Sequence, residues 1–426
     1  MNDSIALRAD GLYKVFGKHP EDAVRRLRDG ASRDDLGGAT AAVIDASFEV
    51  KRGEIFVVMG LSGSGKSTLI RTLNGLQPAT AGTVQIGDDS ITDASTSQLR
   101  DLRRNRVSMV FQHFALLPHR TVIDNVAYGL EIQGKSRDER LRRARQVTDI
   151  VGLAGWEEKF PSQLSGGMQQ RVGLARALAA DTDVLLMDEA FSALDPLIRR
   201  GMQDQLLELQ EKLDKTIIFI THDLNEAMFL GDRIAVMRDG RIVQIGTPEE
   251  ILTDPANDYV AQFVQDVDRA RVLTAGSVME PARSVITATA GPRAALRTMR
   301  DLQTSAIFVL RRDRTFAGVV RDRDVLKQVK GGETDLKEIL ASATSVTADT
   351  ALVDLVELAV ESDLPIAVVD ERNRLIGVIP RVTLLAALGN VSTMTGELQE
   401  AGPPPTVPIS VITDILRETA PEGVQP

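Results

Sequence analysis

A glycine-rich loop early in the chain has the composition and spacing needed to hold phosphate groups. It matches the pattern G-x-x-x-x-G-K-[ST], and it lies between an apolar run at 55–59, which predicts a buried strand, and a predicted helix at 67–73. Because glycine lacks a Cβ atom, the backbone amides of such a loop can approach an anion closely. We expect ATP to be bound by the following residues: Gly60, Leu61, Ser62, Gly63, Ser64, Gly65, Lys66, Ser67 and Thr68.

Two carboxylates follow a second apolar run at 184–187, which also predicts a buried strand. Asp188 can hold the hydration shell of Mg²⁺, and Glu189 can polarise an attacking water. A strand-terminal Asp-Glu pair is also common in solvated turns, but its pairing with a phosphate-binding loop favours catalysis. Lys66 is then expected to reach the β- and γ-phosphates, and Ser67 to ligate the metal.

The segment 164–170, Leu-Ser-Gly-Gly-Met-Gln-Gln, is the most specific motif of the chain. It resembles the signature loop of the ATP-binding cassette (ABC) family, which precedes a helix, here expected at 171–178. A serine hydroxyl and glycine amides at a helix start form a second anion site. Two phosphate sites with one lysine-bearing loop indicate a homodimer that sandwiches nucleotide, with the partner's ATP contacted by Ser165, Gly166, Gly167 and Gln169.

Two further positions are identified by the same resemblance. Gln112 follows a predicted strand at 107–111 and resembles the Q-loop glutamine, which implies contact with the γ-phosphate and Mg²⁺ and a connection to a membrane partner. Asp195 lies in a segment, 192–195, that resembles the D-loop, which implies a position at the dimer interface.

The histidine and the aromatic residue of the site are also assigned by resemblance. His222 follows a predicted strand at 216–221 and resembles the switch histidine, which implies a catalytic contact with the γ-phosphate. Phe16 is expected to stack on the adenine ring, and Tyr13 is the alternative.

Composition restricts the function classes. No run approaches the roughly 18 uncharged apolar residues of a membrane span, and no signal peptide is visible at the N-terminus. Zero cysteines exclude disulfides and thiolate metal sites, and a net charge of −10 argues against non-specific nucleic-acid binding. Any membrane role must therefore act through a partner, and the cytoplasm is the natural compartment. The resemblance to the ABC family implies a peripheral position at the cytoplasmic face of the inner membrane, with a transmembrane permease as the partner.

From residue 4 to about 266 strands and helices alternate, which predicts an α/β nucleotide-binding domain with a parallel sheet. The resemblance to the ABC family implies a P-loop NTPase fold of the ABC nucleotide-binding type. A helical subdomain is expected at about 113–180. Residues 18–30 predict an inserted amphipathic helix, and Asp239-Gly240 predicts a hairpin. The insertion together with segments 59–63, 114–119 and 189–199 resembles the ATPase subunit of glycine betaine/proline betaine importers.

The last third contains an internal repeat with an offset of 59 residues, which aligns Thr287, Ile307, Val309 and Gly318 with Val346, Ile366, Val368 and Gly377. It resembles a tandem pair of cystathionine-β-synthase-type (CBS) domains, an α+β module, at 277–329 and 336–389. We expect the sheets of the two copies to pack against each other. Residues 390–426 are expected to form a flexible tail, because they include the run Gly402-Pro-Pro-Pro.

Adenosine-binding CBS modules place Ser or Thr three residues after the glycine and Asp three residues further on. The first copy has Arg321 and Asp324 at these positions, and the second has Pro380 and Thr383. Basic residues gather in the first copy, whereas none occurs from 341 to 371. Three roles stay open: binding of cyclic di-AMP or another adenine nucleotide, response to ionic strength, and structural support.

The sequence as a whole predicts an ATP-hydrolysing subunit of an osmoprotectant importer. The resemblance implies ATP and Mg²⁺, a homodimer, permease subunits and, indirectly, a substrate-binding protein. The substrate is expected to be glycine betaine or proline betaine, with choline, carnitine or proline as alternatives. The competing classes are a soluble ABC ATPase of repair or translation and a CBS-type ligand-sensing protein.

Overall fold

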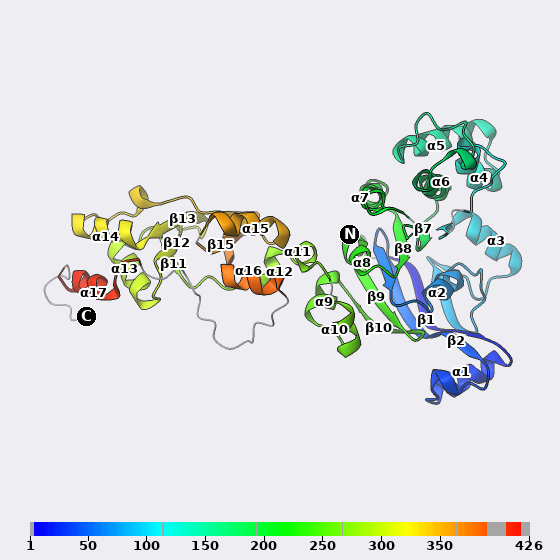
Figure 1. The fold of residues 1–426 in the computed structure, drawn as a ribbon, viewed down its shortest axis with the longest axis horizontal. Coiled ribbons are helices and arrows are strands. Elements are labelled where there is room, and N and C mark those ends of the chain that lie inside the picture. The colour runs from blue at the N-terminus through cyan, green and yellow to red at the C-terminus, as the bar shows by residue number, and fades with distance from the viewer. Residues whose placement is uncertain are drawn as a thin grey trace. The chain divides into compact units, whose positions relative to one another are not determined.

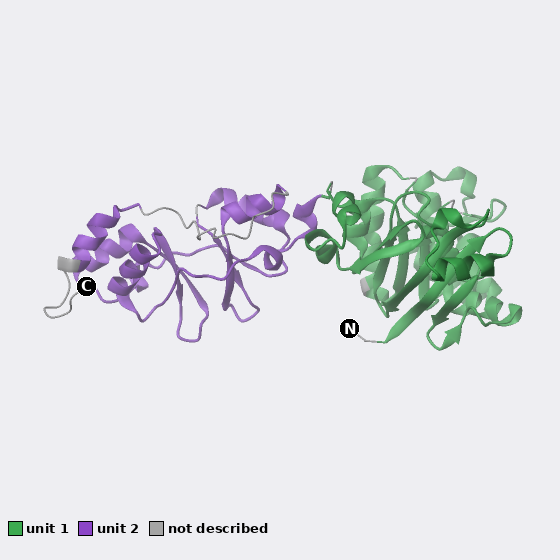
Figure 2. Ribbon diagram, turned by 90° about the horizontal axis from the view of Figure 1, so that it is seen from below, with its two compact units in different colours: residues 1–267 green, residues 268–426 purple. Residues whose placement is uncertain are grey.

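The computed structural model describes residues 4–112, 115–192, 194–265, 267–362, 364–389 and 406–418. Figure 2 shows its two compact units, residues 1–267 and 268–426. The first unit is an α/β domain with a mostly parallel sheet and the second contains two α+β copies, as the sequence predicts.

A six-stranded sheet forms the centre of the first unit, in the order β10-β9-β3-β8-β7-β6. Its strands are β3 (Ile55–Met59), β6 (Val107–Val110), β7 (Val184–Asp188), β8 (Thr216–Thr221), β9 (Arg233–Arg238) and β10 (Arg241–Gly246). All pairs are parallel except β9 with β10. Met59 pairs with Thr221, Asp188 with Ile220 and Val110 with Met187, so the carboxyl ends of four strands lie at one level.

Helix α2 (Lys66–Leu73) begins directly after the glycine-rich loop and packs between this sheet and a second, antiparallel sheet. The second sheet has the order β2-β1-β4-β5, with β1 (Ile5–Phe16), β2 (Thr40–Lys51), β4 (Ala81–Ile86) and β5 (Asp89–Ser90). Leu69, Ile70 and Leu73 join the apolar core shared by both sheets, where the rings of Phe48 and Phe56 stack at 5.1 Å.

The predicted insertion forms α1 (Pro20–Arg28), followed by the short helix η1 (Arg33–Asp35). Ala23, Val24 and Leu27 of α1 pack on the antiparallel sheet, while its charged residues face solvent. This apolar stripe explains why the insertion folds onto the domain.

Three helices form the helical subdomain: α4 (Val122–Ile132), α5 (Arg137–Ile150) and α6 (Gly166–Ala179), with the turn η2 (Pro161–Gln163) before α6. Figure 1 shows them grouped together, apart from the two sheets. The helices beside the sheets are α3 (Thr96–Asn105), α7 (Pro196–Leu213) and α8 (Leu224–Leu230).

The end of the first unit contains the two expected local structures. Asp239 and Gly240 have φ angles of 49° and 83° and form the turn between β9 and β10. Thr247 and Glu250 form a capping box at the start of α9 (Pro248–Thr253), which α10 (Asp258–Phe263) follows.

The second unit contains two similar copies after the short helices α11 (Arg269–Val272) and α12 (Ala275–Val278). The first copy consists of β11 (Val285–Thr287), α13 (Gly291–Asp301), β12 (Ala306–Leu310), β13 (Phe316–Arg321) and α14 (Asp322–Gly331). The second, after η3 (Lys337–Ile339), consists of β14 (Ser345–Thr347), α15 (Leu352–Glu361), β15 (Ile366–Val369), β16 (Leu375–Ile379) and α16 (Arg381–Leu388). Phe308 and Phe316 of one sheet share a core with Ala367 and Val378 of the other, which confirms sheet-to-sheet packing.

The register corrects one of the aligned pairs. Val309 pairs with Gly318 and Val368 with Gly377, as the offset of 59 residues requires. However, Val346 lies opposite Val368, whereas Ile286 lies opposite Val309. The structural equivalent of Val346 is therefore Ile286 and not Thr287, because the segment between the first strand and the second differs in length by one residue.

The prediction of a flexible tail over 390–426 is wrong for residues 406–418. Helix α17 (Ile409–Glu418) packs on the first copy, where Ile412 and Ile415 join the core with Leu296 and Met299 of α13. The proline run and residues 419–426 lie outside the described residues. The proline run favours an irregular segment, whereas the apolar residues at 409, 412, 415 and 416 that follow it have the spacing of a helix.

The described part of the chain has no helix that is both long and apolar enough to span a bilayer.

Candidate nucleotide-binding site

The glycine-rich loop connects β3 to α2 and has the close backbone packing that its glycines predict. Gly60 and Gly65 have φ angles of 155° and 104°. A Cβ atom on Gly60 would lie 2.2 Å from the Met237 carbonyl oxygen, and one on Gly65 would lie 2.0 Å from the Ala42 carbonyl oxygen. The loop therefore sits directly on β9 and β2, and side chains at these two positions would displace it.

Lys66 is buried and bonds to its own loop. Its ammonium donates to the carbonyl oxygens of Gly60 at 2.8 Å and Leu61 at 3.1 Å. Burial lowers the pKa of Lys66, and the negative charges of Glu189 and Asp188 oppose that shift. A buried cation held only by neutral carbonyl groups provides a strong attraction for phosphate oxygens.

Ser67 and Asp188, 121 residues apart in sequence, meet at the carboxyl end of the sheet. The Ser67 hydroxyl donates to Asp188 Oδ1 at 2.9 Å, and only 1% of Asp188 is exposed. These are two of the three residues predicted to lie at Mg²⁺, and the third, Gln112, contacts Glu189 instead. Within the described residues no cluster of three or more His, Cys, Asp or Glu side chains is able to hold a metal. This small donor set fits Mg²⁺, which typically takes one or two carboxylates and completes its shell with phosphate oxygens and water.

Glu189 lies between Gln112 and His222, so the structure brings together three residues that the sequence predicted separately. Gln112 Nε2 donates to Glu189 Oε2 at 3.1 Å, and His222 Nδ1 lies 3.3 Å from the same oxygen. Glu189 has a φ of 48°, in the left-handed region that costs energy for a residue with a side chain. The Glu189 amide donates to the Ile220 carbonyl oxygen at 3.0 Å, which helps to hold this turn.

The signature segment begins helix α6, as predicted. Ser165 is the N-cap residue, and its hydroxyl accepts from the Met168 amide at 3.3 Å. The Gln169 amide group donates to the carbonyl oxygens of Pro161 and Leu164, so this side chain holds the loop that precedes α6. A Cβ atom on Gly167 would lie 3.0 Å from Ile198 of α7, so Gly167 also permits packing within the chain.

The D-loop residue Asp195 is the N-cap residue of α7, and its carbonyl oxygen accepts from the Arg199 amide at 2.8 Å. Ser192 links the same loop to Glu189, because its hydroxyl donates to the Glu189 carbonyl oxygen at 2.9 Å. Ala193, between them, lies outside the described residues.

Exposure separates the two candidates for the adenine contact. Phe16 is 40% exposed at the end of β1, with the Lys14 ammonium 5.0 Å from its ring centroid. Tyr13 is only 4% exposed, packed beneath α1 with the Arg28 guanidinium over its ring. A stacking contact with adenine needs an accessible ring face, and Phe16 has one.

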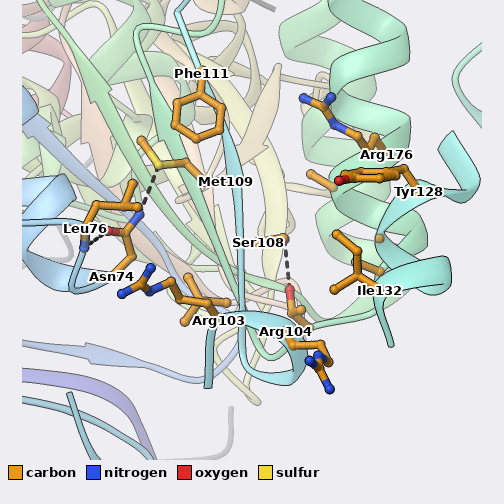
Figure 3. Close-up of a pocket in the computed structure, with 15 residues that line it drawn as sticks. Asn74, Leu76, Arg103, Arg104, Ser108, Met109, Phe111, Tyr128, Ile132 and Arg176 are labelled. Atoms are coloured by element: carbon orange, nitrogen blue, oxygen red, sulfur yellow. Dashed lines mark hydrogen bonds between the residues drawn. The ribbon is translucent and has the colours of Figure 1, made fainter. Parts of the chain in front are cut away.

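A pocket of about 240 Å³ lies between the end of the parallel sheet and the helical subdomain. Figure 3 shows Met109 and Phe111 on one side, with Tyr128, Ile132 and Arg176 from α4 and α6 on the other. Phe111 immediately precedes Gln112, so the lining of the pocket is adjacent in sequence to the predicted Q-loop glutamine.

In the CBS module the predicted nucleotide positions contact side chains of the chain itself. Asp324 lies 3.9 Å from Lys327 on α14, and the Thr383 hydroxyl donates to Glu280. The neighbouring Asp322, which the sequence argument passed over, is 1% exposed and accepts from the backbone amides of Thr406 and Val407. Asp322 lies in the charged run Arg-Asp-Arg-Asp, and nothing in that run indicates that this carboxylate binds a distant backbone segment.

Comparisons with known proteins agree with this geometry. A family model described as ABC transporter matches residues 43–192, and one described as CBS domain matches 275–331 and 336–390. A solved dimeric ATP-binding cassette in a post-hydrolysis state with ADP and phosphate is 30% identical, with a TM-score of 0.50, over 57% of this chain and 98% of that one.

Relatives match nearly the whole chain. The glycine betaine transport ATP-binding protein OpuAA of Bacillus subtilis is 50% identical over 92% of this chain and 95% of its own length. The glycine betaine/proline betaine transport system ATP-binding protein ProV of Escherichia coli is 44% identical over 92% and 100%. These relatives argue against the two alternatives, a soluble ABC ATPase of repair or translation and a CBS-type ligand-sensing protein. The chain belongs to the ATP-binding subunits of ABC-type glycine betaine/proline betaine importers.

Proposed function

We propose that this chain hydrolyses ATP as a homodimer and thereby drives import of a quaternary ammonium osmoprotectant through a separate membrane permease. The observation that carries the proposal is the meeting of Gln112, Glu189 and His222 beside the phosphate-binding loop. The names of the relatives support glycine betaine and proline betaine as substrates. Choline, carnitine and proline would be served by the same ATPase, because the nucleotide site does not select the transported molecule.

Glu189 acts as the general base in the proposed reaction. Its carboxylate accepts a proton as water attacks the γ-phosphorus, and the bond from that phosphorus to the β,γ-bridging oxygen breaks to release ADP. His222 and Gln112 hold the carboxylate from two sides and contact the γ-phosphate. Lys66 leaves the carbonyl groups of Gly60 and Leu61 and compensates the charge that develops on the phosphoryl oxygens.

Ser67, Asp188 and Gln112 would hold Mg²⁺, with Asp188 acting through a water molecule. When bound, the ion neutralises charge on the β- and γ-phosphates. The hydrogen bond from Ser67 to Asp188 keeps both side chains at the end of the sheet, where the loop presents the phosphates.

The second copy of the chain completes each site. Ser165, Gly166 and Gly167 begin a 14-residue helix whose first amides can face the partner's γ-phosphate. Asp195 would cross the interface from the D-loop. The dimeric state of the solved relative supports this arrangement.

The permease is proposed to dock at the pocket beside Gln112. This pocket combines exposed apolar side chains, Leu76 and Ile132, with the cations Arg103, Arg104 and Arg176 around Tyr128. An amphipathic cytoplasmic helix with an acidic rim fits such a surface. Its contact with the segment before Gln112 would couple hydrolysis to transport, at the cytoplasmic face of the membrane.

The CBS module is proposed to regulate transport. Two inputs fit its composition: a cyclic dinucleotide such as cyclic di-AMP, or ionic strength acting on the Arg- and Lys-rich first copy. Deleting residues after 267 and measuring uptake in liposomes at several salt and dinucleotide concentrations separates them. Unchanged responses in the truncated protein would leave the module as structural support.

A Glu189→Gln variant tests the dimer. It removes the base but keeps the phosphate contacts, so Mg-ATP should shift it from monomer to dimer in size-exclusion chromatography. Lys66→Ala in the same background is the matched control and should stay monomeric. A Glu189→Gln protein that binds ATP and remains monomeric would refute ATP-driven dimerisation of the isolated chain.

Cross-linking tests the permease contact. The chain has no cysteine, so single cysteines at Leu76 or Ile132, which are both exposed, give unique labelling positions. Both should cross-link to a co-expressed permease, whereas a cysteine at the exposed Val360 of the second unit should not. Labelling from Val360 alone would contradict docking at this pocket.

A further inference from the structure

Helix α7 contacts two loops, the D-loop segment and the segment that carries His222, through residues to which the sequence assigned no role in the ATP site. We propose that Arg199 is a positioning residue that joins the D-loop to the segment carrying His222, so that the two move as one unit. This inference rests on the proposed catalytic role of His222. It adds a residue whose function follows from its contacts alone.

One side of Arg199 holds the D-loop. Its Nη2 donates to the carbonyl oxygen of Leu194 at 3.2 Å and lies 3.5 Å from that of Ser192. Its own amide donates to the Asp195 carbonyl oxygen at 2.8 Å. One arginine therefore contacts the backbone carbonyl groups of three residues of the loop, Ser192, Leu194 and Asp195, whatever their side chains do.

The other side of Arg199 holds the residue after His222. Arg199 Nη1 lies 3.1 Å from Asp223 Oδ2. The second carboxylate oxygen of Asp223 accepts from the Glu226 amide at 3.2 Å and caps α8. The Asp223 amide in turn donates to the Thr221 hydroxyl oxygen at 2.9 Å. The backbone on both sides of His222 is thus held in place.

A second residue of α7, one turn beyond Arg199, supports the same segment. Gln203 Nε2 donates to Glu226 Oε1 at 3.0 Å, and the Thr221 hydroxyl donates to the other oxygen of Glu226. Gln203 and Glu226 are both buried. Residues four apart lie on one face of a helix, so a single face of α7 contacts the segment twice.

The guanidinium group is essential to this arrangement. Its planar fork reaches the Asp223 carboxylate and the D-loop carbonyl groups at the same time, whereas a lysine ammonium would retain the ion pair and lose the fixed geometry. Arg199 and Asp223 are about one-quarter and one-third exposed, so solvent weakens the charge attraction but leaves the geometry. Arg199→Lys therefore separates position from charge.

The expected effect is on the chemical step. If Arg199 keeps His222 aligned, Arg199→Lys should lower kcat by about 10-fold or more, since small displacements of catalytic groups cost up to about 100-fold. KM for ATP should change less than about threefold, because the phosphate-binding loop is untouched. Arg200→Lys is the matched control: Arg200 is the next residue of α7, lies over the Phe229 ring and pairs with Asp204.

The experiment compares Arg199→Lys, Asp223→Asn, His222→Ala and the double variant Arg199→Lys/His222→Ala with Arg200→Lys. Single-turnover hydrolysis with radiolabelled ATP keeps low rates measurable, and thermal unfolding verifies folding. We expect Arg199→Lys and Asp223→Asn to be slow, Arg200→Lys to be normal, and the double variant to be no slower than His222→Ala. Non-additivity is expected because both changes act through one imidazole.

Normal kcat in Arg199→Lys and Asp223→Asn, with His222→Ala slow, would overturn the positioning role and leave the proposed function standing. The positioning role would also be overturned if the fold-reduction in kcat of the double variant equalled the product of the reductions in the two single variants, since the residues would then act separately. A normal His222→Ala would instead contradict the catalytic role of His222 itself.

Discussion

The chain contains two places where its sequence suggests a nucleotide, and the structure treats them differently. In the first unit the predicted residues converge: Ser67 meets Asp188, and Gln112 and His222 meet Glu189. In the second unit Asp324 pairs with Lys327 of its own helix, Thr383 donates to Glu280, and Asp322 accepts from the C-terminal segment, so these three residues make separate contacts. Convergence of several predicted side chains on one point, rather than a motif alone, distinguishes the candidate site of the first unit from the second unit.

The largest effect should come from the base of the first unit. Glu189→Gln is expected to lower ATP hydrolysis by about 10²- to 10³-fold, because the amide cannot accept the proton of the attacking water. A phosphate-release assay at saturating Mg-ATP measures it. Glu208→Gln, on the exposed face of α7, is the control and should hydrolyse normally. Activity close to wild type in Glu189→Gln would show that the convergence in the first unit is not catalytic.

Removing a predicted metal ligand should lower ATP hydrolysis less than removing the base. Ser67→Ala removes both a hydroxyl ligand and the hydrogen bond to Asp188, and we expect hydrolysis to fall at least about 10-fold, with a higher Mg²⁺ requirement. Ser67→Thr retains the hydroxyl and should recover most of the activity. A Mg²⁺ titration of the hydrolysis rate compares the three proteins. Equal Mg²⁺ dependence in all of them would remove Ser67 from the metal site.

Sequence alone was sufficient for most of the first site, because its motifs are local. The loop at 60–68 and the strand ends at 188 and 222 each have a compact pattern, and a parallel sheet aligns their ends. The links between motifs were not predictable in this way. Arg199 and Asp223 lie 24 residues apart with nothing in the spacing to join them, and their contact depends on how α7 packs on α8.

In the second unit, too, the sequence did not predict a contact between distant segments. The repeat predicted two similar copies, but α17 covers only the first, with Ile412 fully buried. On the second copy, Val360 of α15 and Leu385 of α16 stay exposed. A pattern that repeats in sequence cannot report a contact that occurs once, because the segment that makes it lies outside the repeat.

Burial in the first copy gives a stability prediction. Ile412→Ala should destabilise the second unit by about 2 to 4 kcal/mol, since it removes a fully buried side chain. Leu385→Ala, on the exposed face of the second copy, is the matched control and should cost less than about 0.5 kcal/mol. Urea unfolding followed by circular dichroism measures both. Similar costs at the two positions would show that α17 does not distinguish the copies.

Removing the Asp322 carboxylate, which holds the C-terminal segment, should destabilise the second unit by a similar or slightly smaller amount than Ile412→Ala. Asp322→Ala removes the acceptor for the Thr406 and Val407 amides and should cost about 2 kcal/mol, with hydrolysis by the isolated chain unchanged. Asp324→Ala, two residues along α14, should be nearly neutral. If Asp322→Ala instead abolished hydrolysis while the second unit stayed folded, this residue would belong to a functional site.

The most direct test of the central claim is uptake of radiolabelled glycine betaine into liposomes that contain this chain with its permease and substrate-binding protein. We predict uptake that requires Mg-ATP on the side of this chain and that stops in Lys66→Ala and Glu189→Gln, while Arg200→Lys transports normally. Uptake that continues in Glu189→Gln, or hydrolysis that proceeds in the wild type without any transport of a quaternary amine, would contradict the account.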